Sequence, residues 1–248
     1  MDYLVGVLGG MGPAATVDFM QKLIDLTDAG SDQQHIPLLV SSIPDIPDRG
    51  AYLLNGGESP EPALLCCLQM LEQAGAACIV IPCNTAHYWF PQLKAATQAE
   101  MLNLIEAVAE AAREAGFYRV GLLATGATLA TGLYQTVLER FGIDCVAPEG
   151  ALQEAVMDGI HALKAGDTAS ARRSFDAPYR FLQEQKVEAI ILGCTEIPII
   201  LAGEVREMPA FFLDSNKILA QVVVRWYEKK TGKTLLRPPP VGSSVSSA

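Results

Sequence analysis

Two cysteines occupy matching places in the two halves of the chain, and each ends a short apolar run. Cys83 follows residues 78–82 and precedes Asn84, whereas Cys194 follows residues 189–193 and precedes Thr195. A thiolate can remove a proton and a thiol can return one. If the two halves face each other across a shared cleft, the pair can therefore move a proton from one face of a carbon atom to the other.

A second repeat supports the same division of the chain. Residues 5–12 align without gaps on residues 120–127, and both segments read as a strand that ends in a small-residue turn. Strands alternate with helices throughout, which predicts an α/β fold of two similar parallel-sheet subdomains. Ligands of such sheets bind beyond the carboxyl ends of the strands, where both cysteines fall.

The expected elements follow one strand-then-helix order in each half. Strands are expected at residues 3–8, 37–42, 77–82, 101–105, 119–124, 144–147, 189–192 and 211–213. Helices are expected at 13–29, 60–74, 128–141, 152–165, 167–185 and 216–230. One further helix is expected to end at Gly116, and another to follow Cys194. Residues 231–248 contain a proline run and a serine-rich end, and are expected to form a flexible tail.

Composition excludes several functional classes. The chain has 248 residues, half of them hydrophobic, and a net charge of −10, which argues against nucleic acid or an anionic membrane surface as the main partner. No apolar run is long enough to span a bilayer and no signal peptide is recognisable, so a cytoplasmic protein is expected. Its six cysteines do not indicate a disulfide scaffold in a chain of this length.

Two motifs invite cofactor hypotheses. The turn 9–12 is rich in glycine, but Ala15 stands where a dinucleotide-binding turn needs glycine, and the segment after the next strand, residues 41–44, has no acidic residue. A turn that brings backbone amides to a small anion is favoured instead. Cys83, His87 and Cys194 can supply three zinc ligands. Neither of the other histidines lies in a comparable motif, so no metal is predicted, and His87 either supports the thiol or caps a helix.

Two cations are candidate ligands for an acidic substrate. Arg49 lies in a proline-containing loop after the second strand, where a guanidinium group can clamp a carboxylate. Lys164 ends a predicted helix. The alternatives are a solvated charge for Arg49 and a favourable interaction with the helix dipole for Lys164. The cysteines precede predicted helices, whose amide groups are expected to lower the thiol pKa below about 8.5.

Three motifs together resemble the cofactor-independent aspartate/glutamate racemase family. They are residues 8–13, residues 83–87 and residues 193–196, and the resemblance covers about residues 3–227 and is closest to aspartate racemases. It implies two subdomains related by a pseudo-twofold, with the active site in the cleft between them, and a homodimer. The C-terminal helix returns to the first subdomain, so residues 1–100 with 209–230 form one subdomain and residues 101–208 the other.

The resemblance also implies roles for individual residues. Cys83 and Cys194 are the two acid/base groups, on opposite faces of the α-carbon, and no cofactor takes part. The implied substrate-binding residues are Met11, Arg49, Asn84, Thr85, Thr125, Lys164 and Thr195. Among them, Asn84, Thr85 and Thr195 match residues that hold the α-carboxylate, and Arg49 and Lys164 match cations that hold the side-chain carboxylate.

The implied activity is interconversion of L- and D-aspartate. Glutamate racemases of cell-wall synthesis usually carry histidine directly after the second Cys-Thr, where this chain has Glu196, which tells against glutamate. Some broad-specificity relatives replace the first cysteine with threonine, whereas Cys83 is retained here. Two alternatives remain: a racemase or isomerase of glutamate or another small dicarboxylate, and a non-catalytic amino-acid sensor on the same fold.

Overall fold

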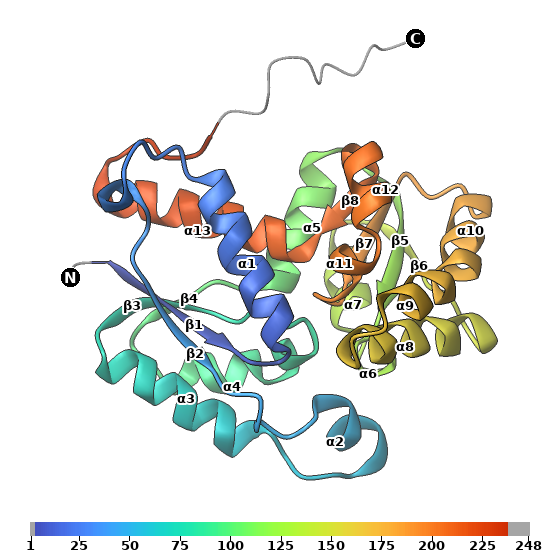
Figure 1. Ribbon diagram of the computed structural model, residues 1–248, viewed down its shortest axis with the longest axis horizontal. Helices are drawn as coiled ribbons and strands as arrows, with labels where there is room; N and C mark the ends of the chain where they lie inside the picture. Colours follow the sequence, from blue (N-terminus) through green and yellow to red (C-terminus); the bar gives the residue numbers. More distant parts are fainter. Residues whose placement is uncertain (1–2, 238–248) are drawn as a thin grey trace.

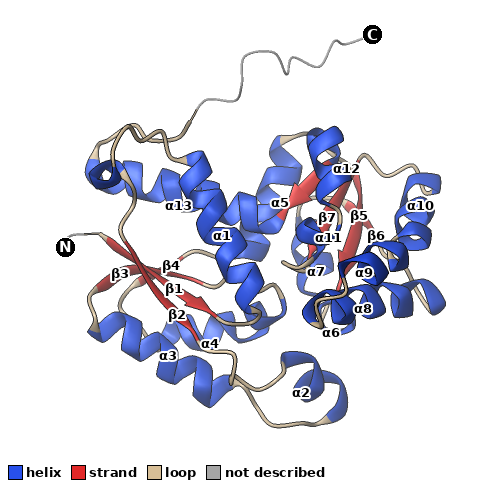
Figure 2. Ribbon diagram, viewed as in Figure 1, coloured by secondary structure: helices blue, strands red, loops and turns tan. Residues whose placement is uncertain are grey.

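The computed structural model describes residues 3–237, which form two parallel sheets flanked by helices (Figures 1 and 2). The strands of the first sheet are β1 (Leu4–Gly9), β2 (Leu38–Ser42), β3 (Ala76–Val80) and β4 (Glu100–Met101). Those of the second sheet are β5 (Arg119–Ala124), β6 (Asp144–Val146), β7 (Ala189–Gly193) and β8 (Phe212–Asp214).

The two sheets have the same topology. Their orders are β2-β1-β3-β4 and β6-β5-β7-β8, and every pairing is parallel. Each strand of the first sheet therefore has an equivalent in the second, with β3 matching β7. The predicted α/β fold of two similar parallel-sheet subdomains is confirmed. Cys83 follows β3 and Cys194 follows β7, so the two cysteines lie after equivalent strands.

Helices cover the sheets of both halves. The first half contributes α1 (Pro13–Leu26), α2 (Arg49–Asn55), α3 (Glu61–Gln73) and α4 (Phe90–Ala95), with 3-10 turns η1 (Asp32–Gln34) and η2 (Thr85–Trp89). The remaining helices are α5 (Leu104–Glu114), α6 (Gly126–Ala130), α7 (Leu133–Arg140), α8 (Ala151–Lys164), α9 (Thr168–Ser174), α10 (Asp176–Glu184), α11 (Ile197–Ile200), α12 (Ala202–Glu207) and α13 (Ser215–Thr231), with η3 at Pro209–Phe211. Between residues 3 and 237, no helix combines the length and apolarity that a bilayer crossing requires.

Two of the central strands, β1 and β7, are buried along their whole length. Every residue of β1 and of β7 is buried, which is why both read as continuous apolar runs in the sequence. The helix that was expected at 128–141 is divided, because Gly132 adopts a left-handed φ of 66° between α6 and α7. The strand expected at 101–105 is reduced to β4, since Asn103 caps the start of α5 instead.

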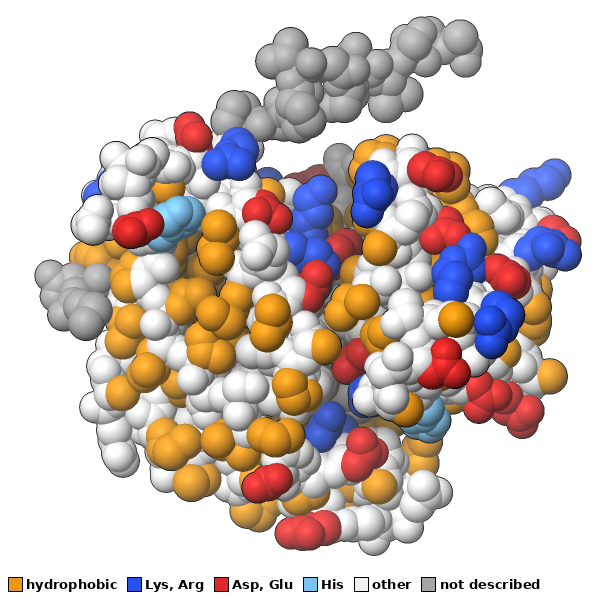
Figure 3. All heavy atoms as spheres, in the orientation of Figure 1, with side chains coloured by type: hydrophobic (Ala, Val, Ile, Leu, Met, Phe, Trp, Pro, Cys, Tyr) orange, Lys and Arg blue, Asp and Glu red, His pale blue; other side chains and the backbone are white. Residues whose placement is uncertain are grey.

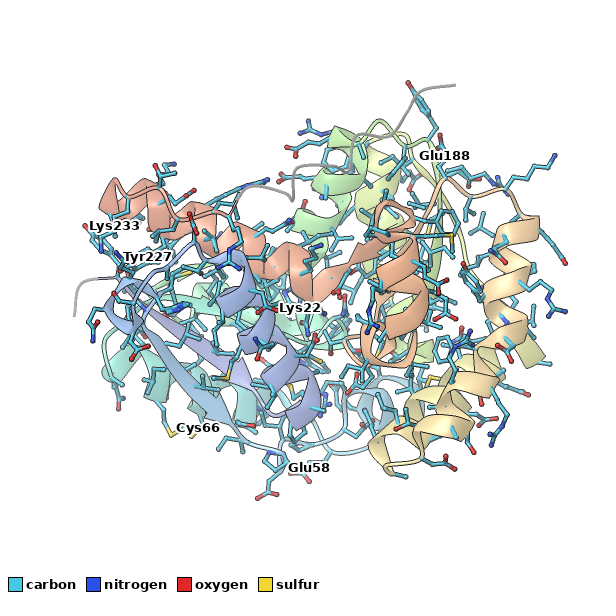
Figure 4. All side chains as sticks on the ribbon, turned by 45° about the horizontal axis from the view of Figure 1, so that its top comes forward. Lys22, Glu58, Cys66, Glu188, Tyr227 and Lys233 are labelled. Atoms are coloured by element: carbon cyan, nitrogen blue, oxygen red, sulfur yellow. The ribbon has the colours of Figure 1, made fainter. Side chains whose placement is uncertain are left out.

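The chain returns to the first half later than expected. Residues 212–214 form the edge strand β8 of the second sheet, so the crossing begins only with α13, which packs against α1 and α5 (Figure 1). Lys22 of α1 bridges Asp18 and Asp214 at this junction (Figure 4). One cluster of buried apolar side chains includes residues of β1, β5 and α13, so the two halves share a core.

The C-terminal segment is packed for longer than the sequence predicts. Leu235 is buried, its carbonyl accepts a hydrogen bond from the backbone of Asp28, and Leu236 pairs antiparallel with Thr27. Residues 231–237, expected as the start of a flexible tail, therefore belong to the first half. The remainder of that expected tail, residues 238–248, lies outside the described residues.

Candidate active site

One cavity at the carboxyl ends of the strands is lined by every residue that the sequence assigned to the site. Its volume is about 80 Å³. The predicted residues that line it are Met11, Arg49, Cys83, Asn84, Thr85, Thr125, Lys164, Cys194 and Thr195. They come from segments that follow β1, β2, β3, β5 and β7 and from the end of α8. The duplication places these segments opposite one another because equivalent strand ends face the same space.

Both candidate acid/base groups are free thiols. The residues Cys83 and Cys194 are each 6% exposed, and no disulfide joins any cysteines within residues 3–237. Cys66, in contrast, lies on the outer surface of α3 at the periphery of the molecule (Figure 4). Two buried thiols that follow equivalent strands therefore line the same cavity.

The environment of Cys194 differs from the expectation of a lowered pKa. Its Sγ donates a 2.9 Å hydrogen bond to Oε2 of Glu196. Burial, followed by the negative charge of Glu196, raises the pKa of Cys194 well above its ordinary value. The next helix after this cysteine, α11, begins at Ile197 and is only four residues long. Burial, together with the carboxylate two residues away, therefore keeps Cys194 as a protonated thiol.

Three threonine hydroxyls form a closed triangle at the boundary between the halves. Thr85 Oγ1 lies 3.0 Å from Thr125 Oγ1 and 2.8 Å from Thr128 Oγ1, and the last two are 2.9 Å apart. Thr125 is also the N-cap of α6, where it accepts a hydrogen bond from the Thr128 amide. The triangle fixes the hydroxyls of Thr85 and Thr125 on the cavity wall. Each hydroxyl has one proton, so one that donates to a carboxylate gives up its donation within the triangle.

Asn84 is held by residues from both halves. Its Oδ1 accepts a 2.5 Å hydrogen bond from Tyr134, and its Nδ2 donates at 3.1 Å to Ser215. The Ser215 hydroxyl in turn donates to the carbonyl of Leu192 at 2.8 Å. An amide has two N–H donors. One N–H group of Asn84 therefore remains for a ligand, in an orientation that its neighbours fix.

Arg49 is presented by a helix instead of the loop that the sequence suggested. It is the first residue of α2, whose N-cap is Asp48. Its Nη1 donates to the carbonyls of Ile46 and Pro47 at 3.2 and 3.1 Å. Its Nε is buried and has no hydrogen-bond partner among the described residues. A carboxylate that accepted from Nε would satisfy this donor.

Lys164 ends α8 as predicted, but its nearest charged partner is inside the site. Its Nζ lies 3.9 Å from Oε1 of Glu196. A neighbouring cavity of about 560 Å³ shares Asp48, Arg49, Lys164 and Glu196 with the first. Figure 3 shows basic and acidic side chains along the boundary between the two halves of the molecule. Because Lys164 lines the cavity, a positive charge faces it in a protein whose net charge is −10.

His87 has a structural role that the sequence left open. Its Nε2 accepts a hydrogen bond from the Leu104 amide at 3.1 Å, so Nδ1 carries the proton and donates to the Cys83 carbonyl at 2.8 Å. Burial lowers the pKa of His87 to about 4, which keeps the ring neutral. Because both nitrogens are engaged, the imidazole cannot complete the zinc site that Cys83 and Cys194 suggested.

Several residues of the site were not assigned to it from the sequence. Tyr134, Ser215 and Thr128 are hydrogen-bonded to predicted residues, and Asp48 and Glu196 line the cavity. Glu196 was visible in the sequence beside Cys194, but its contact with the thiol was not. Tyr134 and Ser215 lie far along the chain from Asn84, so only the fold brings them together.

The chain matches known proteins over most of its length. The family described as Asp/Glu/hydantoin racemase matches residues 8–223. A solved structure of Picrophilus torridus aspartate racemase superposes with a TM-score of 0.84 at 36% identity, and the match covers 94% of this chain and 96% of that chain. The broad-specificity amino-acid racemase of Bacillus subtilis is 28% identical over 90% of this chain and 98% of its own length.

Glutamate racemases are also similar to this chain. The Thermus thermophilus glutamate racemase is 32% identical over 64% of this chain and 58% of its own length. These three similar proteins are all named as amino-acid racemases, and they differ in the amino acid that their names specify.

Proposed function

The chain belongs to the Asp/Glu/hydantoin racemase family, and we propose that it interconverts L- and D-aspartate by a two-base mechanism without a cofactor. The observation that carries this proposal is the cavity that holds Cys83 and Cys194 on equivalent strand ends together with Arg49 and Lys164. The thiols supply acid/base chemistry, and the cations suit a substrate with a second carboxylate.

The mechanism assigns the two thiols alternating roles. One thiolate removes the α-proton, the electron pair moves into the α-carboxylate, and the opposite thiol delivers its proton to the other face. Hydrogen-bond donors fixed by the protein stabilise the developing charge on that carboxylate. Thr85, Thr125 and the free N–H group of Asn84 are suited to this role because other residues already fix their positions.

Recognition of the side-chain carboxylate is assigned to Arg49 and Lys164. The buried Nε of Arg49 has no partner within residues 3–237, and Lys164 has only a 3.9 Å contact with Glu196. Both cations are therefore available to a ligand that brings a negative charge. The likeness to Picrophilus torridus aspartate racemase favours aspartate.

Glutamate is the second candidate substrate. The similarity to the Thermus thermophilus glutamate racemase and to a broad-specificity racemase supports it. Chiral chromatography of the products of L-aspartate and of L-glutamate, with a chelator present and no added cofactor, distinguishes the candidates. We expect turnover of both enantiomers of aspartate with a kcat/KM above that for glutamate. Preference for glutamate would reverse the assignment, and binding without turnover of any amino acid would favour a sensor.

The proposed assembly is a homodimer in the cytoplasm. It is an expectation from the resemblance to the racemase family, and sedimentation of the purified full-length protein tests the oligomeric state directly.

A further inference from the structure

The carboxylate of Glu196 lies between the Cys194 thiol and the Lys164 ammonium group. Its Oε2 accepts from Cys194 Sγ at 2.9 Å, and its Oε1 faces Lys164 Nζ at 3.9 Å. The side chain of Glu196 is 4% exposed, whereas that of Lys164 is 42% exposed. One buried carboxylate thus connects the proposed acid/base thiol to a proposed substrate-binding cation.

On the basis of the function proposed above, we infer that Glu196 is the proton acceptor of Cys194 and that a dicarboxylate ligand triggers the transfer by drawing Lys164 away from Glu196. Glu196 acts through Cys194 and does not act on the α-carbon itself. The second carboxylate of the substrate then activates the thiol as well as contributing to recognition.

In the ligand-free site the proton belongs on sulfur. Cys194 Sγ is the donor and Oε2 of Glu196 the acceptor of their 2.9 Å hydrogen bond, as expected because a carboxylic acid is a much stronger acid than a thiol. Lys164 adds to this preference because its charge lies next to Oε1. The other charged or titratable groups that line the cavity are Cys83 after β3, Asp48 and Arg49 at the start of α2, and His161 on α8.

A bound dicarboxylate changes this balance in two ways. Lys164 has a long, half-exposed side chain, so it can turn from Glu196 towards a ligand carboxylate without unfolding α8. A second negative charge close to Glu196 raises the proton affinity of its carboxylate. Both effects favour the thiolate with a neutral Glu196. A monocarboxylic amino acid produces neither effect, since it leaves Lys164 beside Glu196.

The proton transfer balances without another reactant. The S–H bond of Cys194 breaks and an O–H bond forms on Oε2 of Glu196, which leaves a thiolate and a neutral carboxylic acid. The thiolate then takes the α-proton, and Cys83 delivers its own proton to the opposite face. The starting state is restored when Glu196 releases its proton to solvent and Cys83 takes one up.

The test follows the ultraviolet absorption of thiolate while succinate is added to the full-length protein at neutral pH. Succinate carries two carboxylates but has no amino group, so it cannot be racemised. We expect up to one thiolate per chain to appear in the native protein. No increase should appear in Cys194→Ser or in Glu196→Gln. Glu106→Gln is the matched control, because Glu106 lies in an exposed ion pair with Arg140, and it should behave as the native protein does.

Calorimetry of succinate binding to each variant completes the experiment. If succinate binds Glu196→Gln and still produces the thiolate signal, Glu196 is not the acceptor and the inference fails, while the racemase proposal stands. If succinate binds the native protein without any thiolate signal, the trigger fails in the same way. If succinate does not bind the native protein, the inference also fails, and the racemisation assay then decides the proposed function separately.

Discussion

The hydroxyl of Tyr134 donates a 2.5 Å hydrogen bond to Oδ1 of Asn84 and so joins α7 of the second half to the segment that follows β3 of the first. Both side chains are buried. This bond sets the orientation of the Asn84 amide beside Cys83. The position of one candidate carboxylate donor therefore depends on the packing of the two halves against each other.

Tyr134→Phe should weaken both the fold and the proposed activity. Loss of the hydroxyl leaves the buried Oδ1 of Asn84 without its donor, which typically costs about 1–3 kcal/mol. We expect the free energy of unfolding to fall by about that amount and kcat/KM on aspartate to fall about tenfold. Denaturant titration and a racemisation assay measure the two effects.

Tyr179→Phe is the matched control for that substitution. The Tyr179 hydroxyl is buried and has no hydrogen-bond partner within residues 3–237. Its removal should change stability much less than Tyr134→Phe and leave racemisation intact. Equal effects of the two substitutions would show that the bond to Asn84 has no special importance.

Replacement of either proposed acid/base cysteine should abolish racemisation in both directions. Each direction needs one base and one acid, so Cys83→Ala and Cys194→Ala each remove an essential partner. By the family resemblance, Cys194 faces the L-enantiomer and Cys83 the D-enantiomer. The surviving thiol should therefore still exchange the α-proton of one enantiomer for deuterium, which proton NMR in heavy water detects.

Cys66→Ala provides the control, because this cysteine is exposed on α3 and does not line the cavity. It should racemise aspartate as the native protein does. Near-native racemisation by Cys83→Ala or Cys194→Ala would remove that residue from the mechanism.

Arg49→Ala and Lys164→Ala should each reduce the use of aspartate by at least tenfold. Removing one partner of a desolvated charge pair costs roughly 2–5 kcal/mol, and about 1.4 kcal/mol corresponds to a factor of ten. Activity on alanine, which has no second carboxylate, should change much less. Steady-state kinetics on both amino acids measure the difference.

Arg206→Ala removes an exposed positive charge from α12 and is the control for the net charge of the protein. It should leave kcat/KM on aspartate unchanged. Should all three variants behave alike, other groups must hold the side-chain carboxylate.

The sequence predicted which strands carry the site residues, but it did not predict the contacts that their side chains make. Apolar runs that end in cysteine indicate buried strands with their carboxyl ends at one edge, and the duplication indicates that two such edges are equivalent. The raised pKa of Cys194 was not predictable from these patterns, because it comes from burial of the thiol and from the negative charge of Glu196. Both depend on tertiary packing, and the 2.9 Å contact with Glu196 is set by side-chain geometry.

Contacts between segments that are far apart in the sequence were not predicted either. Ser215 holds Asn84 only because α13 begins beside the end of β7, and the edge strand β8 decides where α13 begins. The sequence predicted a strand at 211–213, and the family resemblance placed it with residues 1–100, whereas β8 pairs with β7 of the second sheet. Three-residue strands carry too little pattern to identify their neighbours.

The buried imidazole of His87 should make the fold sensitive to mild acid. Its pKa in the folded protein is about 4, against a reference value of about 6.5 for an exposed histidine. Between these values the unfolded chain binds a proton that the folded protein does not. The stabilisation is therefore fully present above about pH 6.5 and is lost as the pH falls to about 4, by about 3 kcal/mol in total.

Denaturant titration at a series of pH values measures this loss. Other groups also titrate in the same range, so the native protein must be compared with His87→Gln. Glutamine cannot take up a proton, and its amide can replace one of the two hydrogen bonds that His87 makes to Cys83 and Leu104. We expect His87→Gln to be less stable near neutral pH but to lose less stability on acidification. Parallel stability curves for the two proteins would show that His87 titrates alike in the folded and unfolded states, contrary to its buried, doubly hydrogen-bonded position.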